Sequence, residues 1–130
     1  MKKPPISPVT EEDKAYFDER VKHWQDKLGL NDWRIVRSKR KKTKNMAEIF
    51  DRDVHHRLAS YGIGDDFGSV GTSKESLDST ALHEVAHIFL QGLIQAAIDH
   101  QQGNETLAEE HRIIHILERL LPTNEKGPKN

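Results

Sequence analysis

The chain has 130 residues, enough for one compact domain, and its formal net charge of −1 is not that of a dedicated nucleic-acid binder. It contains no cysteine, which excludes disulfides and thiolate metal sites, so a metal would have to be held by histidine and carboxylate groups. Prolines and polar residues follow Met1-Lys2-Lys3 where a signal peptide would be apolar. We therefore expect a cytoplasmic protein that contacts no membrane.

The first predicted helix runs from about Thr10 to Leu28. The sequence Thr10-Glu11-Glu12-Asp13 matches a capping box, and Gly29 is placed to end the helix. Residues 1–9 are expected to be a flexible N-terminus, and the domain is expected to span 10–121. Apolar residues at helical spacing predict the buried face of the helix: Phe17, Val21, Trp24 and Leu28.

Three short strands are predicted next, at Trp33–Ser38, Met46–Asp53 and Arg57–Ile63. Short connections and alternating apolar residues predict that they form a small antiparallel sheet. His55 and His56 fall in the hairpin between the second and third strands, where exposed turn residues are the usual case. We do not expect these two histidines to bind a metal.

A dense basic run occupies residues 37–44, between the first two strands. Such a run is typical of a solvated loop, although it could also contact nucleic acid phosphates or an acidic partner. No aromatic residue interrupts it, so the segment gives no support for base stacking. The residues that would make a nucleic-acid contact are Lys39, Arg40, Lys41, Lys42 and Lys44.

A second helix is predicted after the loop 65–71, because Thr72-Ser73-Lys74-Glu75 reads as a capping box. This helix carries His83-Glu84-Val85-Ala86-His87, the HExxH pattern. Residues four apart lie on one helix face, so His83 and His87 can bind the same tetrahedral zinc ion. Glu84 lies beside them and suits a general base that deprotonates a metal-activated water.

A catalytic zinc needs a third protein ligand, and a third predicted helix, from Thr106 to Leu121, supplies one. Thr106-Leu107-Ala108-Glu109 resembles a capping box, and Pro122 ends the helix. Glu110 falls near the middle of the apolar face, where an unpaired carboxylate would cost several kcal/mol. A zinc ion shared with His83 and His87 would stabilise it. The alternative is that a basic side chain or water pairs with Glu110.

Three other side chains are candidates for further parts of the site. His111 and His115 border the Glu110 face, and either could replace Glu110 as ligand or stabilise the oxyanion of a scissile carbonyl. Exposed helix histidines are the simpler interpretation. Tyr61 is another candidate oxyanion partner, with cross-strand packing as its alternative.

The HExxH helix must end early for Glu110 to reach the metal. An unbroken helix from Ser73 to Gln102 would place Glu110 about 15 Å from His87. We therefore predict a break between Gly92 and Gly103, with Gly92 as the stop and a separate short segment from Leu93 to His100.

These residues give the chain a resemblance to the zincin metallopeptidases of the gluzincin type, in which a glutamate on a later helix joins HExxH. Leu90 and Leu93 occupy the places where a metzincin has glycine and histidine, and the aspzincin Gly-Thr-x-x-Asp signature is missing. More closely, the chain resembles small metallopeptidase domains encoded by phages and prophages. The matching residues are Trp24, Leu28, Gly29, Leu30, Trp33, Arg34 and Ile35, with Glu110 and His111 opening the last helix.

The resemblance implies a minimal zincin-like α+β domain: an N-terminal helix, a small antiparallel sheet, the HExxH helix and a C-terminal helix carrying the third ligand. It also implies a zinc metalloendopeptidase with one Zn²⁺, held by His83, His87 and Glu110, and a peptide or protein substrate. A sheet edge, for which the third strand is the candidate, would pair with the substrate. The tail 122–130 is expected to be disordered.

Two other functions fit the same residues. The domain could be a non-catalytic, metal-stabilised interaction module of a phage, or a protease that the basic run directs to nucleic-acid-bound proteins. Substitution of Glu84 separates the first from a peptidase, since a binding module does not need the general base. The sequence leaves the substrate and the oligomeric state open.

Overall fold

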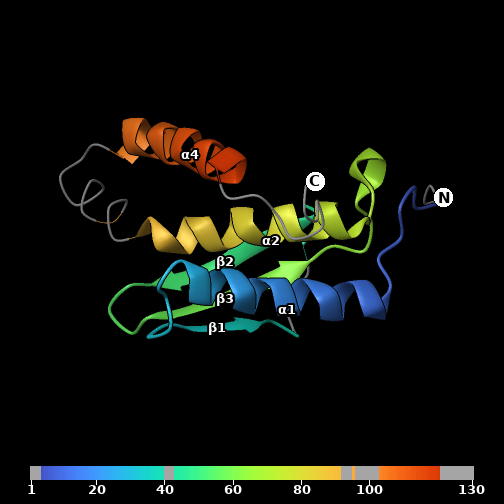
Figure 1. The fold of residues 1–130 in the computed structure, drawn as a ribbon, viewed down its shortest axis with the longest axis horizontal. Coiled ribbons are helices and arrows are strands. Elements are labelled where there is room, and N and C mark those ends of the chain that lie inside the picture. Colours follow the sequence, from blue (N-terminus) through green and yellow to red (C-terminus); the bar gives the residue numbers. More distant parts are fainter. Residues whose placement is uncertain (1–3, 40–42, 92–94, 96–102, 121–130) are drawn as a thin grey trace, which may run out of the picture.

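The computed structural model describes residues 4–39, 43–91, 95 and 103–120. In this part of the chain the protein is α+β, as expected, with a small sheet and three long helices labelled α1, α2 and α4. Helix α2 lies between α4 on one side and the sheet with α1 on the other (Figure 1). Among the described helices, none has the length and apolar character needed to span a membrane.

Helix α1 spans Glu11–Lys27 and begins as the sequence predicts. The Thr10 hydroxyl accepts a hydrogen bond from the Asp13 N–H, and the Asp13 carboxylate accepts one from the Thr10 N–H, so the capping box is confirmed. Gly29 has a φ of 71°, a conformation that glycine adopts without strain, and it follows the helix end. Phe17, Val21 and Trp24 are buried, while Leu28 is half-buried.

The strands are β1 (Arg34–Arg37), β2 (Ala47–Asp53) and β3 (Leu58–Ile63), in the spatial order β1-β3-β2. The prediction of an antiparallel sheet is wrong, because β1 runs parallel to β3 and only β2 is antiparallel to it. The third strand is also wrong as the candidate edge, since β3 is the central strand. Its sequence LASYGI carries no charge, whereas both neighbours carry charged residues, which edge strands tolerate.

Strand β2 is the edge that packs against α2, and it contains a bulge. Ile49 pairs with Tyr61 and Asp51 pairs with Ser60, so Phe50 is the extra residue between two regular stretches. The β2–β3 turn covers residues 54–57, and His55 and His56 are exposed in it, as expected.

Helix α2 spans Lys74–Phe89. Its N-cap is Ser73, not Thr72, because Ser73 is the extended residue directly before the helix and its hydroxyl accepts from the Ser76 N–H. Leu90 caps the other end, so the helix stops three residues before Gly92, the predicted stop. Gln91 and Gln95 are helical, and the rest of the predicted segment 93–100 lies outside the described residues.

Helix α4 spans Gly103–Leu120. Thr106 therefore lies inside the helix, three residues after its first residue, and the predicted cap there is wrong. The helix packs against α2, and Ile114 is fully buried. Tail residues 122–130 lie outside the described chain.

The N-terminal segment expected to be flexible includes residues 6–9, which bond to the loop after β3. The Asp66 carboxylate accepts from the N–H groups of Ile6 and Ser7. The Val9 N–H donates to the Asp65 carbonyl at 2.9 Å, and the Phe67 N–H donates to the Ser7 carbonyl at 3.0 Å. These bonds hold the loop that leads into α2.

Helices α1 and α2 are joined by a buried polar network. The fully buried carboxylate of Asp78 on α2 accepts from Arg20 Nε and from Trp24 Nε1, each at 2.7 Å. Arg20 is itself only 6% exposed, so its charge has little solvent to stabilise it. The pair therefore fixes α2 against α1 and depends on both partners being present.

Replacing Asp78 with asparagine should lower the free energy of unfolding by about 3–5 kcal/mol, because the substitution removes the negative charge that lies 2.7 Å from the buried Arg20 Nε. Urea unfolding would measure the change. Asp32→Asn is the control: Asp32 pairs with Arg57, and both side chains are about half exposed, so the expected loss is below about 1 kcal/mol. Equal losses in the two variants would contradict this role for Asp78.

Candidate functional site

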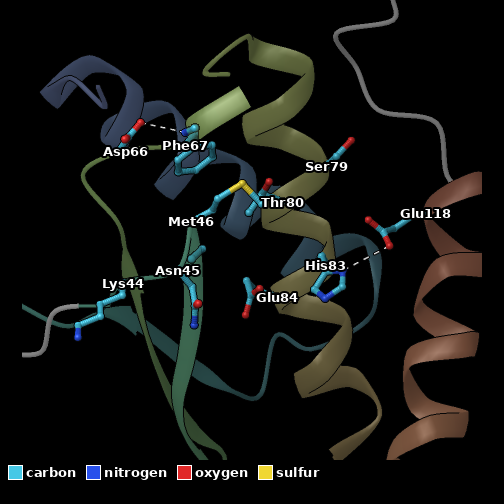
Figure 2. A pocket seen from close by; sticks show the side chains of 12 residues that line it. Lys44, Asn45, Met46, Asp66, Phe67, Ser79, Thr80, His83, Glu84 and Glu118 are labelled. Carbon is cyan, nitrogen blue, oxygen red and sulfur yellow. Dashed lines mark hydrogen bonds and ion pairs between the residues drawn. The ribbon is translucent and has the colours of Figure 1, made fainter. Parts of the chain in front are cut away.

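The HExxH residues lie in the second half of α2 and point toward different neighbours. His83 faces α4, whereas Glu84, one residue on and about 100° around the helix, faces β2 (Figure 2). Glu84 is 9% exposed, and the histidines are half-buried. One turn of α2 therefore presents imidazoles to one element and a carboxylate to another.

Three imidazoles converge where α2 meets α4. The ring centroids of His83 and His87 are 5.0 Å apart, and His111 of α4 lies 5.1 Å from His87 and 6.3 Å from His83. One nitrogen from each ring can be chosen so that all three lie within 4.8 Å of one another. Imidazole nitrogens around a tetrahedral zinc lie about 3.4 Å apart. Small side-chain rotations would therefore let this set hold a divalent ion.

Glu110 is beside His87, as the sequence predicts, but its contacts differ from those of a ligand. Only 2% of it is exposed. Its Oε2 lies 2.8 Å from His87 Nδ1 and 3.3 Å from Arg52 Nη1 of β2. The contact with His87 is possible because α2 ends at Phe89. An early end of this helix is what the sequence predicts to be necessary for Glu110 to reach His87. The arginine is the basic partner that was the alternative to a metal.

The position of Glu110 fits a carboxylate that orients a metal ligand. A carboxylate on one ring nitrogen fixes the proton there and leaves the other nitrogen available for a metal. Glu110 is hydrogen-bonded to Nδ1 of His87 in this way. In the part of the chain that the structure describes, neither group of side chains suited to a metal includes Glu110.

Glu118 makes the corresponding contact with His83. Its Oε1 lies 3.3 Å from His83 Nδ1 and 3.0 Å from Nδ1 of His115, which is on the same helix. The side chain of His115 is 67% exposed, and that of Glu118 is 24% exposed. Each histidine of the HExxH motif is thus hydrogen-bonded through Nδ1 to a carboxylate of α4.

The site changes the acid–base properties of several of its groups, among them His83, His87 and Glu84. The hydrogen bond from His83 to Glu118 raises the pKa of His83 despite partial burial. Burial lowers the pKa of His87, although Glu110 opposes the change. Burial raises the pKa of Glu84 to about 7, against the opposing effects of His83 and of a hydrogen bond from the Ile49 backbone.

A cavity of about 540 Å³ opens beside His83 and Glu84. Figure 2 shows Met46, Phe67 and Thr80 pointing into it from the residue before β2, the loop after β3 and α2, with Lys44 and Asp66 farther out. A second hollow of about 210 Å³ continues along β2. It is lined by Ala47, Glu48, Ile49, Arg52, Glu84 and His87.

The remaining residues predicted to belong to a functional site lie away from the histidines or outside the described part of the chain. Tyr61 is buried in the core, where it donates to Asp18 Oδ1 at 2.6 Å and packs on Phe17, so it makes the packing contact that was its alternative. Lys39 and Lys44 are exposed, and Lys44 also lines the larger cavity. Residues 40–42 lie outside the described part of the chain.

Sequence reasoning missed Arg52 and Glu118. Glu118 had a signal: it follows His111 by seven residues and His115 by three, which places all three on one side of a helix. Arg52 had none, because a charged residue in an edge strand usually faces water. Its contact with Glu110 joins residues 58 positions apart.

No protein-family model, curated protein or solved structure matches the chain. The arrangement of the side chains is therefore the basis for assigning a function to the site. Three imidazoles could hold an ion, two carboxylates orient the imidazoles, and a buried carboxylate of intermediate pKa lies next to a cavity. This combination suits metal-assisted hydrolysis.

Replacing Arg52 with alanine should lower the free energy of unfolding by about 1–3 kcal/mol, because the buried Glu110 carboxylate loses a charged donor. Arg37→Ala is the matched control. Like Arg52, Arg37 bonds to a carboxylate that has a second partner, because Asp18 also accepts a hydrogen bond from Tyr61. The pair of Arg37 and Asp18 is about one-third exposed, so it should contribute less than about 1 kcal/mol to the free energy of unfolding. Urea unfolding measures both, and equal effects would argue against the importance of the Glu110 contact.

Proposed function

We propose that the protein is a zinc-dependent metallopeptidase of the zincin type that hydrolyses peptide bonds with Glu84 as general base. The observation that carries the proposal is the convergence of His83, His87 and His111, with nitrogens within 4.8 Å of one another, beside the buried Glu84. Two of these histidines and Glu84 form the HExxH pattern, whose spacing suits this chemistry.

In this proposal His83, His87 and His111 hold the zinc, and Glu110 and Glu118 orient His87 and His83 through their Nδ1 atoms. The ligand set differs from the sequence expectation, because the Glu110 carboxylate is occupied by His87 Nδ1 and Arg52. Zinc, when bound, supplies polarisation of the substrate carbonyl and lowers the pKa of a water molecule.

Glu84 accepts a proton from the attacking water and then donates it to the leaving amine. Its position supports this role, since it is held at the floor of the cleft between α2 and β2. A hydrogen bond from the Ile49 backbone fixes the carboxylate and limits how far burial raises its pKa. Its pKa is about 7 in the metal-free protein, and a zinc ion nearby would lower it, so the carboxylate is ready to accept a proton at neutral pH.

The substrate would lie along β2. This strand pairs only with β3 in the described sheet, so its other edge can receive an extended peptide as an added strand. A peptide there would pass Glu84. The larger cavity, with Met46 and Phe67 in its wall, would receive an apolar side chain next to the bond that is cut.

The central test replaces Glu84 with glutamine. Hydrolysis of a generic protein substrate such as casein should fall by about 10²- to 10⁴-fold, because the proton acceptor is lost while the zinc ligands remain. Zinc content, measured by atomic absorption, should not change. Glu75→Gln, at an exposed position on the same helix, is the control and should keep both properties.

Hydrolysis that persists in Glu84→Gln would refute the proposal. Full zinc content with no hydrolysis in the unmodified protein would favour the other interpretation, a metal-stabilised interaction module.

A second test identifies the third ligand through zinc affinity. Glu110→Gln should weaken zinc binding about 10- to 100-fold, as expected when an orienting group is lost. His111→Ala should weaken it more, because a ligand itself is removed. Competition with a chromogenic chelator measures both, with the exposed turn residue His55 replaced by alanine as the control. A greater loss in Glu110→Gln than in His111→Ala would make Glu110 the ligand instead.

A further inference from the structure

We propose that His83, His115 and Glu118 form a second metal site, which competes with the first site for His83. A nitrogen from each ring and a carboxylate oxygen of Glu118 lie within 4.8 Å of one another. Glu118 Oε1 is the centre of the group, 3.0 Å from His115 Nδ1 and 3.3 Å from His83 Nδ1. Two imidazoles and one carboxylate are a ligand set that zinc accepts.

The helices arrange this set in advance. His115 and Glu118 are three residues apart on α4, so they share a face of the helix, and that face is directed at His83 on α2. The centroids of the His83 and His115 rings are 5.9 Å apart. The contact between α2 and α4 therefore fixes the third group relative to the other two.

Each set contains one exposed histidine, His111 in the first and His115 in the second. Beside the shared His83, the remaining member is 14% exposed at its side chain in the first set (His87) and 24% exposed in the second (Glu118), so the second set is slightly more open to solvent. Glu118 and His83 also line the cavity of about 540 Å³, which gives an ion a path from water. An ion in the second set keeps water ligands and binds more weakly than one in the first.

Competition follows from the two nitrogens of His83. Nδ1 faces Glu118, so the first set is left with Nε2. A neutral imidazole carries its proton on one nitrogen only. A metal at Nδ1 therefore moves the proton to Nε2 and removes that nitrogen from the first set. Each set also has two ligands of its own, so both can hold an ion while His83 serves only one of them. Filling the second set weakens the first, so excess zinc inhibits. This consequence rests on the proposed function, whereas metal binding by the second set does not.

The test is a zinc titration of the metal-free protein by calorimetry. The unmodified protein should bind two equivalents, the second more weakly, and His115→Ala should bind one. His56→Ala is the matched control: His56 also contacts a carboxylate three residues away, that of Asp53, but belongs to neither candidate ligand set of the described residues, and should leave both equivalents unchanged. A single equivalent in the unmodified protein, or a second equivalent that persists in His115→Ala, would overturn the proposal.

Inhibition gives a second measurement. The ratio of hydrolysis rates with one and with ten equivalents of zinc should exceed one in the unmodified protein and approach one in His115→Ala. Equal ratios above one in both would overturn the competition. Because the titration counts bound ions, two equivalents without any hydrolysis would refute the proposed function and leave the second site standing. Hydrolysis by a protein that binds only one ion would support the proposed function and refute the second site.

Discussion

The buried carboxylate of Glu110 is the point on which the geometry of the site depends. It brings three elements together: it projects from α4, receives the imidazole of His87 from α2 and receives Arg52 from β2. A carboxylate with 2% exposure is costly without such partners, so the three elements are stable together in one arrangement. That arrangement also brings His111 to the HExxH histidines.

A second buried carboxylate, Asp78, performs a similar task at the other face of α2. It lies about 1.4 turns before His83 on the same helix and holds α1 through Arg20 and Trp24. Helix α2 is therefore fixed by ionic contacts on both sides, and the histidines lie on a rigid support. A rigid support suits a metal site, since ligands held in advance lose little freedom on binding.

Several local features of the sequence were predicted well, although two of the three helix caps were misplaced, and long-range features were not predicted. The capping box at Thr10, the buried face of α1 and the strand positions depend on neighbouring residues, which the sequence displays directly. The order of the strands depends on which strand lies at the centre of the sheet, with a neighbour on each edge. The lack of charged residues in β3 was a sign in the sequence that this strand is the central one. Helical spacing placed Glu110 in the interior correctly. Helical spacing could not identify Arg52 as the partner of Glu110, because Arg52 lies in a strand that is distant in the sequence.

The bulge at Phe50 has a consequence for how this chain tolerates insertions and deletions. Ile49 pairs with Tyr61 and Arg52 with Ala59, so the extra residue turns both side chains to the same face of the sheet, although they are three residues apart. In a regular strand they would point to opposite faces. Deletion of Phe50 alone would leave Ile49 and Arg52 two positions apart, the spacing at which a regular strand puts side chains on the same face, so Arg52 would still face Glu110 and the pairings with Tyr61 and Ala59 would keep their register. The bulge is therefore a point at which β2 can lose a residue without turning Arg52 away from its partner.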